Sequence, residues 1–170
     1  GSDGIGLSGT GDLLVERLVA SAGDIRLSAP SALVVQSLEA TVGRATLTAG
    51  GSLSVGSALV GRDLTVSAGT DVTLGSVTAG GTRIAVEAGG SVETTGLISG
   101  FLLDVRAGAS AELTTAVERL SAVAGGGLRV LEQDDLVIRE MTMPGGSVEI
   151  QTGGSLSTEG PLEAFQLDLV

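Results

Sequence analysis

The chain has 170 residues, a formal net charge of −11 and no Lys, His or Cys. These absences exclude an ordinary zinc site, a Ser-His-Asp or Cys-His pair, a Schiff-base lysine and a disulfide framework. The acidic charge and the near absence of aromatic residues argue against nucleic acid as a partner, because its recognition uses Lys/Arg contacts and aromatic stacking.

A short pattern (apolar, any, apolar, any, small) recurs from one end of the chain to the other. Its starting positions are Ile5, Ile25, Ala45, Leu64, Ile84, Leu103, Leu128, Val148 and Leu167. Seven of the eight steps between these positions have nearly the same length, about 20 residues, which indicates an internal repeat.

Each repeat is predicted to contain two further short strands. A second alternating pair begins eight residues after the start, as in Leu13 with Val15 and Leu33 with Val35; Leu136 with Ile138 belongs to the same set. A third apolar position follows about five residues later. Its members are Leu18, Leu38, Leu59, Val77, Leu97, Met141 and Leu162. Alternation with a period of two residues favours strands, so we expect three per repeat.

One step, from Leu103 to Leu128, is longer than all the others and defines a long coil. The letters of Val117–Leu120 repeat those of Val15–Leu18, which favours a coil with four extra residues in the turn after Ala107 and one extra Gly before Leu128. The alternative is an inserted helix over 111–124, since its apolar residues also fall near helical spacing.

A unit of about 20 residues cannot bury its apolar side alone and needs stacked neighbours. We therefore predict an all-β fold, a parallel β-helix of about eight coils over residues 1–170 as a single domain, on the order of 40 Å long. The general preference for right-handed crossovers predicts its handedness. Leu47, Val66, Val86 and Val105 should form one column of the core. A β-sandwich would also suit the strand spacing, but it would not require such columns.

Two columns of turn residues follow the first strand of each repeat. The first contains Gly50, Gly69, Gly89, Gly108 and Gly153, where we expect a positive φ or a sharp bend. The second contains short polar acceptors, which can bond backbone N–H groups in the turn. Its members are Asp12, Ser52, Asp71, Ser91, Asp135 and Ser155.

The repeat also predicts which outward side chains are neighbours on successive coils. Glu87 should lie beside Arg106, and Asp104 beside Arg129. Along the second of these columns Arg129 should be followed by Glu149 and then Asp168. Exposed pairs of this kind contribute no more than about 1 kcal/mol each, so their value is in reporting the register.

Glu132, Asp134 and Asp135 form the densest acidic cluster. Paired carboxylates could serve a carbohydrate-active β-helix or hold calcium, but aromatic platforms and a spaced Asp pattern are missing. We favour a solvated acidic turn, and predict no catalytic, cofactor-binding or metal-binding residue and no enzyme activity. An ice- or surface-binding β-helix is a further alternative, but the hydroxyl column Ser8, Ser28, Thr48 and Ser67 then gives way to Glu87 and Arg106.

The segments 49–55, 68–74 and 88–92 resemble the repeats of filamentous-haemagglutinin-type exoproteins, and the resemblance covers nearly the whole chain. Members of that family are large secreted adhesins, exported by a two-partner system, with a β-helical shaft. Those shafts often carry Asn in their turns, whereas this chain has Ser and Asp there.

The resemblance implies a non-catalytic structural shaft or stalk of a secreted or cell-surface bacterial protein, without a cofactor. From the composition we expect no membrane span and no nucleic acid as a partner, and from the uncapped ends and outward apolar residues we expect possible protein contacts end to end or side by side. The resemblance adds a possible host or cell-surface ligand, bound through the parent protein. Neither end of the sequence shows a polar capping segment, so we expect a fragment of a longer shaft.

Overall fold

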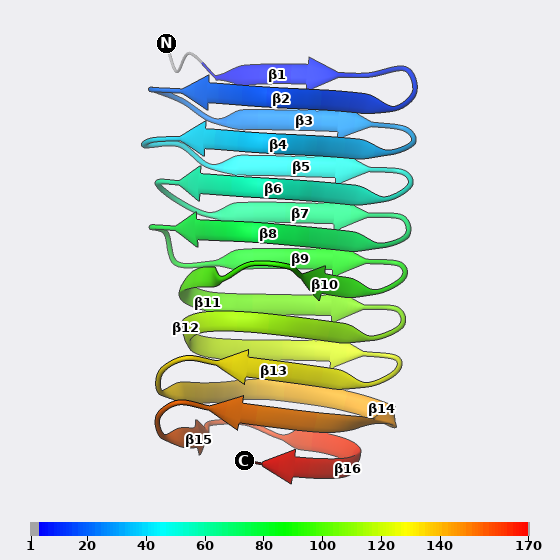
Figure 1. Cartoon of the computed structure of the whole chain (residues 1–170), viewed down its shortest axis with the longest axis vertical. Coiled ribbons are helices and arrows are strands. Elements are labelled where there is room, and N and C mark those ends of the chain that lie inside the picture. Colours follow the sequence, from blue (N-terminus) through cyan, green and yellow to red (C-terminus); the bar gives the residue numbers. More distant parts are fainter. Residues whose placement is uncertain (1–3, 170) are drawn as a thin grey trace.

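Every regular element of this protein is a β-strand in the computed structural model, which describes residues 4–169. The strands are β1 (Ile5–Ser8), β2 (Leu13–Ala20), β3 (Ile25–Ala29), β4 (Leu33–Ala40), β5 (Ala45–Ala49), β6 (Leu53–Val60), β7 (Leu64–Ala68), β8 (Val72–Ala79), β9 (Ile84–Ala88), β10 (Val92–Thr94), β11 (Ile98–Ala107), β12 (Ala111–Ala124), β13 (Leu128–Glu132), β14 (Leu136–Thr152), β15 (Leu156–Thr158) and β16 (Leu162–Leu169). All pairings are parallel, and the chain winds into a β-solenoid of about 8 turns, ~20 residues apart, as predicted (Figure 1). Its handedness remains a prediction.

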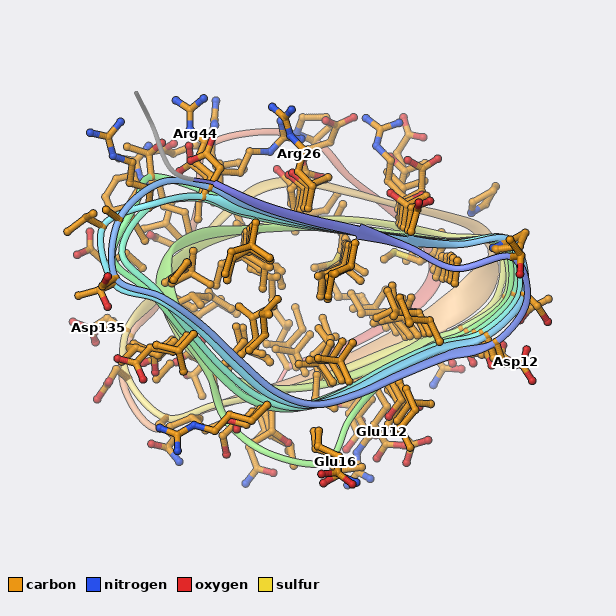
Figure 2. The ribbon with its side chains drawn as sticks, turned by 90° about the horizontal axis from the view of Figure 1, so that it is seen from above. Asp12, Glu16, Arg26, Arg44, Glu112 and Asp135 are labelled. Carbon is orange, nitrogen blue, oxygen red and sulfur yellow. The ribbon has the colours of Figure 1, made fainter. Side chains whose placement is uncertain are left out.

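Two walls of strands enclose the core. Wall A begins with β1, β3, β5, β7 and β9, and wall B with β2, β4, β6, β8 and β10; in Figure 1 their arrows point in opposite directions. The long strands β11, β12 and β14 continue these walls toward the C-terminal end. Figure 2, looking down the stack, shows apolar side chains filling the flattened space between the walls and charged ones outside.

The second and third strands predicted for each repeat form one bent strand in the first four coils. In β4, Gln36 and Ser37 both point outward, so the alternation slips by one residue and the strand turns while its ladder continues. The third inward position is Ala58 in β6 and Ile98 in β11, so the predicted Leu59 and Leu97 were wrong by one residue, whereas the predicted Val77 in β8 is buried. Hydrophobicity misled the prediction because a small Ala faces the core while its neighbour Leu59 is 51% exposed.

The core consists of columns of stacked aliphatic side chains. Leu47, Val66, Val86 and Val105 lie side by side on successive wall A strands, and each is at most 2% exposed, which confirms the predicted column. Burying one such side chain contributes roughly 1.5–3 kcal/mol. Because every coil repeats this burial, stability is spread along the length of the stack.

The glycine column at the turn from wall A to wall B has a different cause from the predicted one. A Cβ on Gly69 would lie 2.0 Å from the carbonyl oxygen of Gly50, and one on Gly125 would lie 2.3 Å from that of Gly108. Among the described residues only Gly23 has a positive φ. Glycine is therefore required because successive turns stack closely. Gly125 occupies this column, whereas the predicted Gly153 stacks on Gln133 in another turn.

The predicted long coil from Leu103 to Leu128 is wrong. Leu103 pairs with Leu120 on wall A, and Leu128 pairs with Ala111 on wall B. Residues 111–124 form the strand β12, so the helix alternative and the extended turn after Ala107 are both ruled out. The later starts at Val148 and Leu167 consequently lie on wall B, and Leu136 with Ile138 on wall A.

The coil from Leu103 to Leu120 is short because it loses a corner. In the earlier coils a turn such as residues 80–83 separates the end of wall B from the next wall A strand. In β12 the chain passes from Val117 on wall B to Leu120 on wall A within one strand. The segment Val15–Leu18, which has the same sequence as Val117–Leu120, lies wholly on wall B. The sequence match therefore aligned two segments that occupy different positions in the coil.

Candidate functional site

The acidic cluster at the turn after β13 is built into the backbone of the solenoid. Glu132 is only 5% exposed. One carboxylate oxygen accepts hydrogen bonds from the N–H groups of Gln133 and Asp134 at 3.0 and 3.3 Å, and the other from Val117 at 3.2 Å. Three backbone N–H groups thus donate to the carboxylate of Glu132, and this side chain faces inward.

The position of Glu132 follows from the shortened coils. In the earlier coils the second half of a wall B strand, such as Leu38–Ala40, pairs with the corresponding residues of the next coil. After β13 that half is replaced by the turn 133–135, so the N–H of Val117 has no strand beside it and donates to Glu132 instead. A buried N–H without a partner would cost about 1–3 kcal/mol.

The other two members of the cluster have different environments. Asp135 accepts a hydrogen bond from the backbone N–H of Ser155 in the next coil, at 2.6 Å. Asp134 is exposed. With Glu132 inward and Asp135 used between coils, this turn lacks the two free facing carboxylates that glycoside hydrolysis requires. The described residues also contain no group of three or more His, Cys, Asp or Glu side chains that could hold a metal ion.

Hydrogen bonds from one coil to the Asp of the previous coil recur along the stack. Asp12 accepts from the N–H of Ala32 at 3.1 Å, and Asp71 from that of Ser91 at 2.8 Å. The sequence predicted acceptors at these positions, but for their own turns. In the structure they join one turn to the next, as Asp24 and Asp63 do at the opposite corner.

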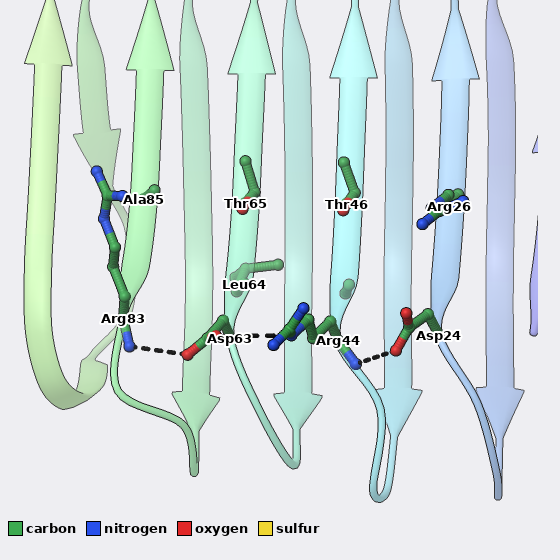
Figure 3. A pocket seen from close by; sticks show the side chains of 10 residues that line it. Asp24, Arg26, Arg44, Thr46, Asp63, Leu64, Thr65, Arg83 and Ala85 are labelled. Atoms are coloured by element: carbon green, nitrogen blue, oxygen red, sulfur yellow. Dashed lines mark hydrogen bonds and ion pairs between the residues drawn. The ribbon is translucent and has the colours of Figure 1, made fainter.

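A group of charged side chains on wall A lies at this opposite corner. Here a hollow of about 310 Å³ is lined by Arg26, Arg44, Arg83, Asp24 and Asp63 (Figure 3). Asp24 accepts from the N–H of Arg44 at 2.9 Å, and Asp63 from those of Thr82 and Arg83 at 2.9 and 3.0 Å.

Two of the three arginines of this hollow, Arg44 and Arg83, are also paired. The Nε of Arg44 lies 3.7 Å from an oxygen of Asp63, and the guanidinium of Arg83 pairs with Asp104. Both carboxylates that line the hollow therefore hold the backbone or guanidinium of a neighbouring coil. The hollow is a surface where coils are joined, with no aromatic side chain among the residues that line it.

The outward columns on wall A follow the predicted register up to the shortened coils. Ser8, Ser28, Thr48 and Ser67 are successive neighbours, followed by Glu87 and Arg106. The predicted neighbours Glu87 and Arg106 are thus confirmed, and the hydroxyl column ends after four coils.

The outward column on wall B corrects one predicted pair. Arg129 lies beside Glu112 and Glu149, at 3.3 and 3.7 Å, and Glu149 beside Asp168. Asp104 pairs instead with Ser121 on wall A, so the predicted pair of Asp104 with Arg129 was wrong. The cause is the same misplaced coil, since it moved Leu128 and its neighbour Arg129 to the opposite wall.

One buried polar group was missed by the sequence reasoning. Thr115 is fully buried on the strand beside Glu132, and its hydroxyl has no hydrogen-bond partner among the described residues. Its column holds Val77 and Ile98 in the preceding coils. The sequence does contain a signal for this group, because Thr115 is a polar residue in a column of apolar residues. That column can be recognised only when residues 111–124 are assigned to the correct coil.

No protein family matches the chain, and no curated protein and no solved structure does either. The described residues also contain no helix long and apolar enough to cross a membrane. The function has to be argued from the geometry of the solenoid itself.

Proposed function

We propose that this chain is a segment of a non-catalytic structural shaft in a large secreted or cell-surface bacterial protein of the adhesin kind. The observation that carries the proposal is the use of its carboxylates. Glu132, Asp12, Asp71 and Asp135 accept hydrogen bonds from backbone N–H groups of neighbouring coils or turns. These acids act as links along the stack, which is what a rod under tension needs.

The repetition of the coils supports the same proposal. Wall A and wall B run from the first described coil to the last with one continuous core. The resemblance of residues 49–55, 68–74 and 88–92 to filamentous-haemagglutinin-type repeats agrees with a shaft. A ligand on a host or cell surface would then be bound by the parent protein beyond this rod.

A shaft acts through its length, so whole coils should be removable. Ala45 and Ile84 hold equivalent positions two coils apart, so deletion of residues 45–83 joins matching ends. We expect a cooperatively folded rod that is shorter by about two strand spacings, ~10 Å. X-ray scattering and thermal unfolding measure both properties, and a deletion variant that fails to fold would count against independent, stackable coils.

Localisation is tested in the organism that makes the protein. A tag inserted in the parent protein next to this segment should bind antibody on unpermeabilised cells or be recovered from the medium. Labelling that requires permeabilisation would overturn the proposal. Turnover of a polysaccharide that is lost in both Asp134→Asn and Asp135→Asn would overturn its non-catalytic part.

A surface-binding rod is the second candidate, favoured by the hydroxyl column on wall A. Thr48 and Ser28 border a hollow of about 380 Å³ beside Arg26 and Thr46. Ser28→Glu combined with Thr48→Glu removes the two middle hydroxyls of this column, whereas Val34→Glu combined with Ser54→Glu changes two outward neighbours on wall B of the same coils. Loss of adhesion to an ice or mineral surface in the first variant alone would favour this candidate over the shaft.

A further inference from the structure

The two walls carry different charged side chains on their outer surfaces. Figure 2 shows Arg26 and Arg44 outside one wall, and Glu16 and Glu112 outside the other. Five of the nine arginines lie on wall A strands or in the turns that lead into them. These are Arg26, Arg44, Arg62, Arg83 and Arg106. In a chain with a net charge of −11, the arginines are thus concentrated on one face.

The hollow at the arginine-rich corner continues along wall A. The hollow of about 310 Å³ shares Thr65, Arg83 and Ala85 with a second hollow of about 90 Å³. The first hollow reaches Arg26 on β3, and the second reaches Arg106 on β11. Together they form a trough, the wall A trough, across four strand spacings, or ~19 Å. Both β3 and β11 have a strand on either side, so coils of this chain border the trough at each end.

The floor of the wall A trough is low and polar. Past Arg26 the outward column continues with small side chains, at Thr46, Thr65 and Ala85, which Figure 3 shows in line. The two hydroxyls can donate and accept hydrogen bonds. No aromatic side chain of the described part of the chain lines either hollow. A ligand here would therefore be held by hydrogen bonds and charge, without stacking.

Two arginines beside the trough already bind carboxylates of this chain. Arg44 pairs with Asp63, which lies one coil further along. Arg83 pairs with Asp104, again one coil further along. The charge of these carboxylates is offset by their partners, so they do little to repel a bound anion. The two pairs also show that a guanidinium on this face can bind a carboxylate across one coil spacing.

The arginines at the two ends of the trough are exposed and form no ion pair among residues 4–169. Arg26 has Thr46 beside it in the next coil, where Arg44 and Arg83 have an acid. Arg106 has Glu87 beside it, which would oppose an anion there. A guanidinium has five N–H donors in a fork that fits a carboxylate. Both ends of the trough can therefore take a carboxylate from a ligand.

We propose that the wall A trough binds a linear polysaccharide that carries carboxylate groups and lies along the axis of the rod. Arg26 and Arg106 each bind a carboxylate, and the hydroxyls of Thr46 and Thr65 bond to the sugars between them. Coils repeat every ~4.8 Å, so a polymer of repeating units meets similar groups on successive coils. The proposal gives the rod a ligand of its own and so goes beyond a shaft that only carries a binding part of the parent protein.

The test titrates the full chain with octagalacturonate, which carries one carboxylate per sugar. Calorimetry at low salt should show binding that weakens as added salt screens the charges. Arg26→Ala and Arg106→Ala should each weaken it by about five-fold, the most that an exposed ion pair usually contributes. Glu87→Gln should strengthen it, because this change removes the opposing charge beside Arg106.

The controls separate the trough from general charge attraction. Arg17→Ala removes the same charge from an exposed position of β2 on wall B, and it should leave the affinity unchanged. Neutral dextran of the same length should not bind. Digalacturonate is too short to reach from Arg26 to Arg106 and should bind more weakly than the octamer. All variants should keep a wild-type circular dichroism spectrum, because the changed side chains are exposed.

Four results would overturn the proposal. The first is the absence of octagalacturonate binding. An equal loss of affinity in Arg17→Ala would show attraction to charge anywhere on the rod. Tighter binding of dextran sulfate of the same length would assign the trough to sulfate groups. Self-association of the wild type that is lost in Arg26→Ala would assign it to an acidic protein surface. The shaft proposal stands in each case, because removal of whole coils tests it separately.

Discussion

The first coils and the later coils of this solenoid enclose the same core with different coil lengths and different corners. From Ile25 to Ala88 the chain repeats a coil of nearly constant length, with a Gly turn at one corner and a polar turn at the other. In β11 and β12 the second corner is lost, because each of these strands runs from wall B to wall A without a turn, and the coil from Leu103 to Leu120 is shorter than those before it. The inward columns continue through the change. A coil can therefore lose residues as long as the inward positions and backbone partners are preserved.

The difference lies in how backbone partners are supplied. In the first coils strands pair with strands, and Asp side chains add hydrogen bonds at the turns. In the shortened coils Glu132 takes the place of a strand for Val117. A side chain thus substitutes for missing main chain, and the shortened region should depend on single residues more than the regular region does.

The largest effect is expected for a charge placed in the regular core. Val66→Asp puts a carboxylate in a fully buried column, and we expect a loss of several kcal/mol in the free energy of unfolding. Thr65→Asp, one residue away and pointing outward, is the control and should change it by less than about 0.5 kcal/mol. Urea unfolding measures both; equal losses would mean that the two positions are not on opposite sides of wall A.

The shortened coils should respond next most strongly to Glu132→Ala. This change leaves the N–H groups of Val117 and Asp134 without their acceptor, whereas the N–H of Gln133 still donates to the carbonyl of Thr115 at 2.9 Å, so we expect a loss of about 1–3 kcal/mol. Glu132→Gln keeps acceptor oxygen and should lose less. Hydrogen exchange at Val117 should accelerate in the Ala variant. Unchanged stability would show that Glu132 does not replace a strand.

The ladder on wall B should give a small and salt-sensitive effect. Arg129→Ala removes the ion pairs with Glu112 and Glu149, and we expect a loss of about 1 kcal/mol at low salt that shrinks as salt screens the charges. Thermal unfolding at two salt concentrations measures it. A loss independent of salt would assign the effect to packing of the Arg stem.

Acid should weaken the first coils through Asp12. Hydrogen bonds from Ser31 and from the N–H of Ala32 hold the pKa of this carboxyl below its ordinary value of 3.8. Its contribution to stability is therefore complete above the unfolded pKa and is lost as the pH falls through the lower folded pKa. Asp12→Asn should lose less stability than the wild type between pH 5 and pH 2, about the range in which such carboxyls titrate. Identical acid profiles of the two proteins would contradict the role of this carboxylate.

The sequence predicted the solenoid and the regular columns because a regular recurrence of one apolar pattern leaves few alternatives. It failed at residues 103–128, where Val117–Leu120 matched Val15–Leu18 in letters and not in position. Apolar and polar residues alternate in the same way in the strands of both walls. This pattern alone therefore cannot distinguish a coil that has lost a corner from a coil that has gained residues in a turn. Glu132 could be recognised as part of an acidic cluster, but its inward orientation depends on the missing strand.

The register of the shortened coil is the claim on which the rest depends, and cysteine pairs test it directly. The chain has no Cys, so introduced pairs react without background. Neighbouring strands lie about 4.8 Å apart, within the Cα separation of about 4.4–6.8 Å that a disulfide spans. Asp104→Cys with Ser121→Cys should cross-link efficiently under mild oxidation, and Asp104→Cys with Arg129→Cys should not. Cross-linking of the second pair in place of the first would restore the long coil from Leu103 to Leu128 and contradict this account.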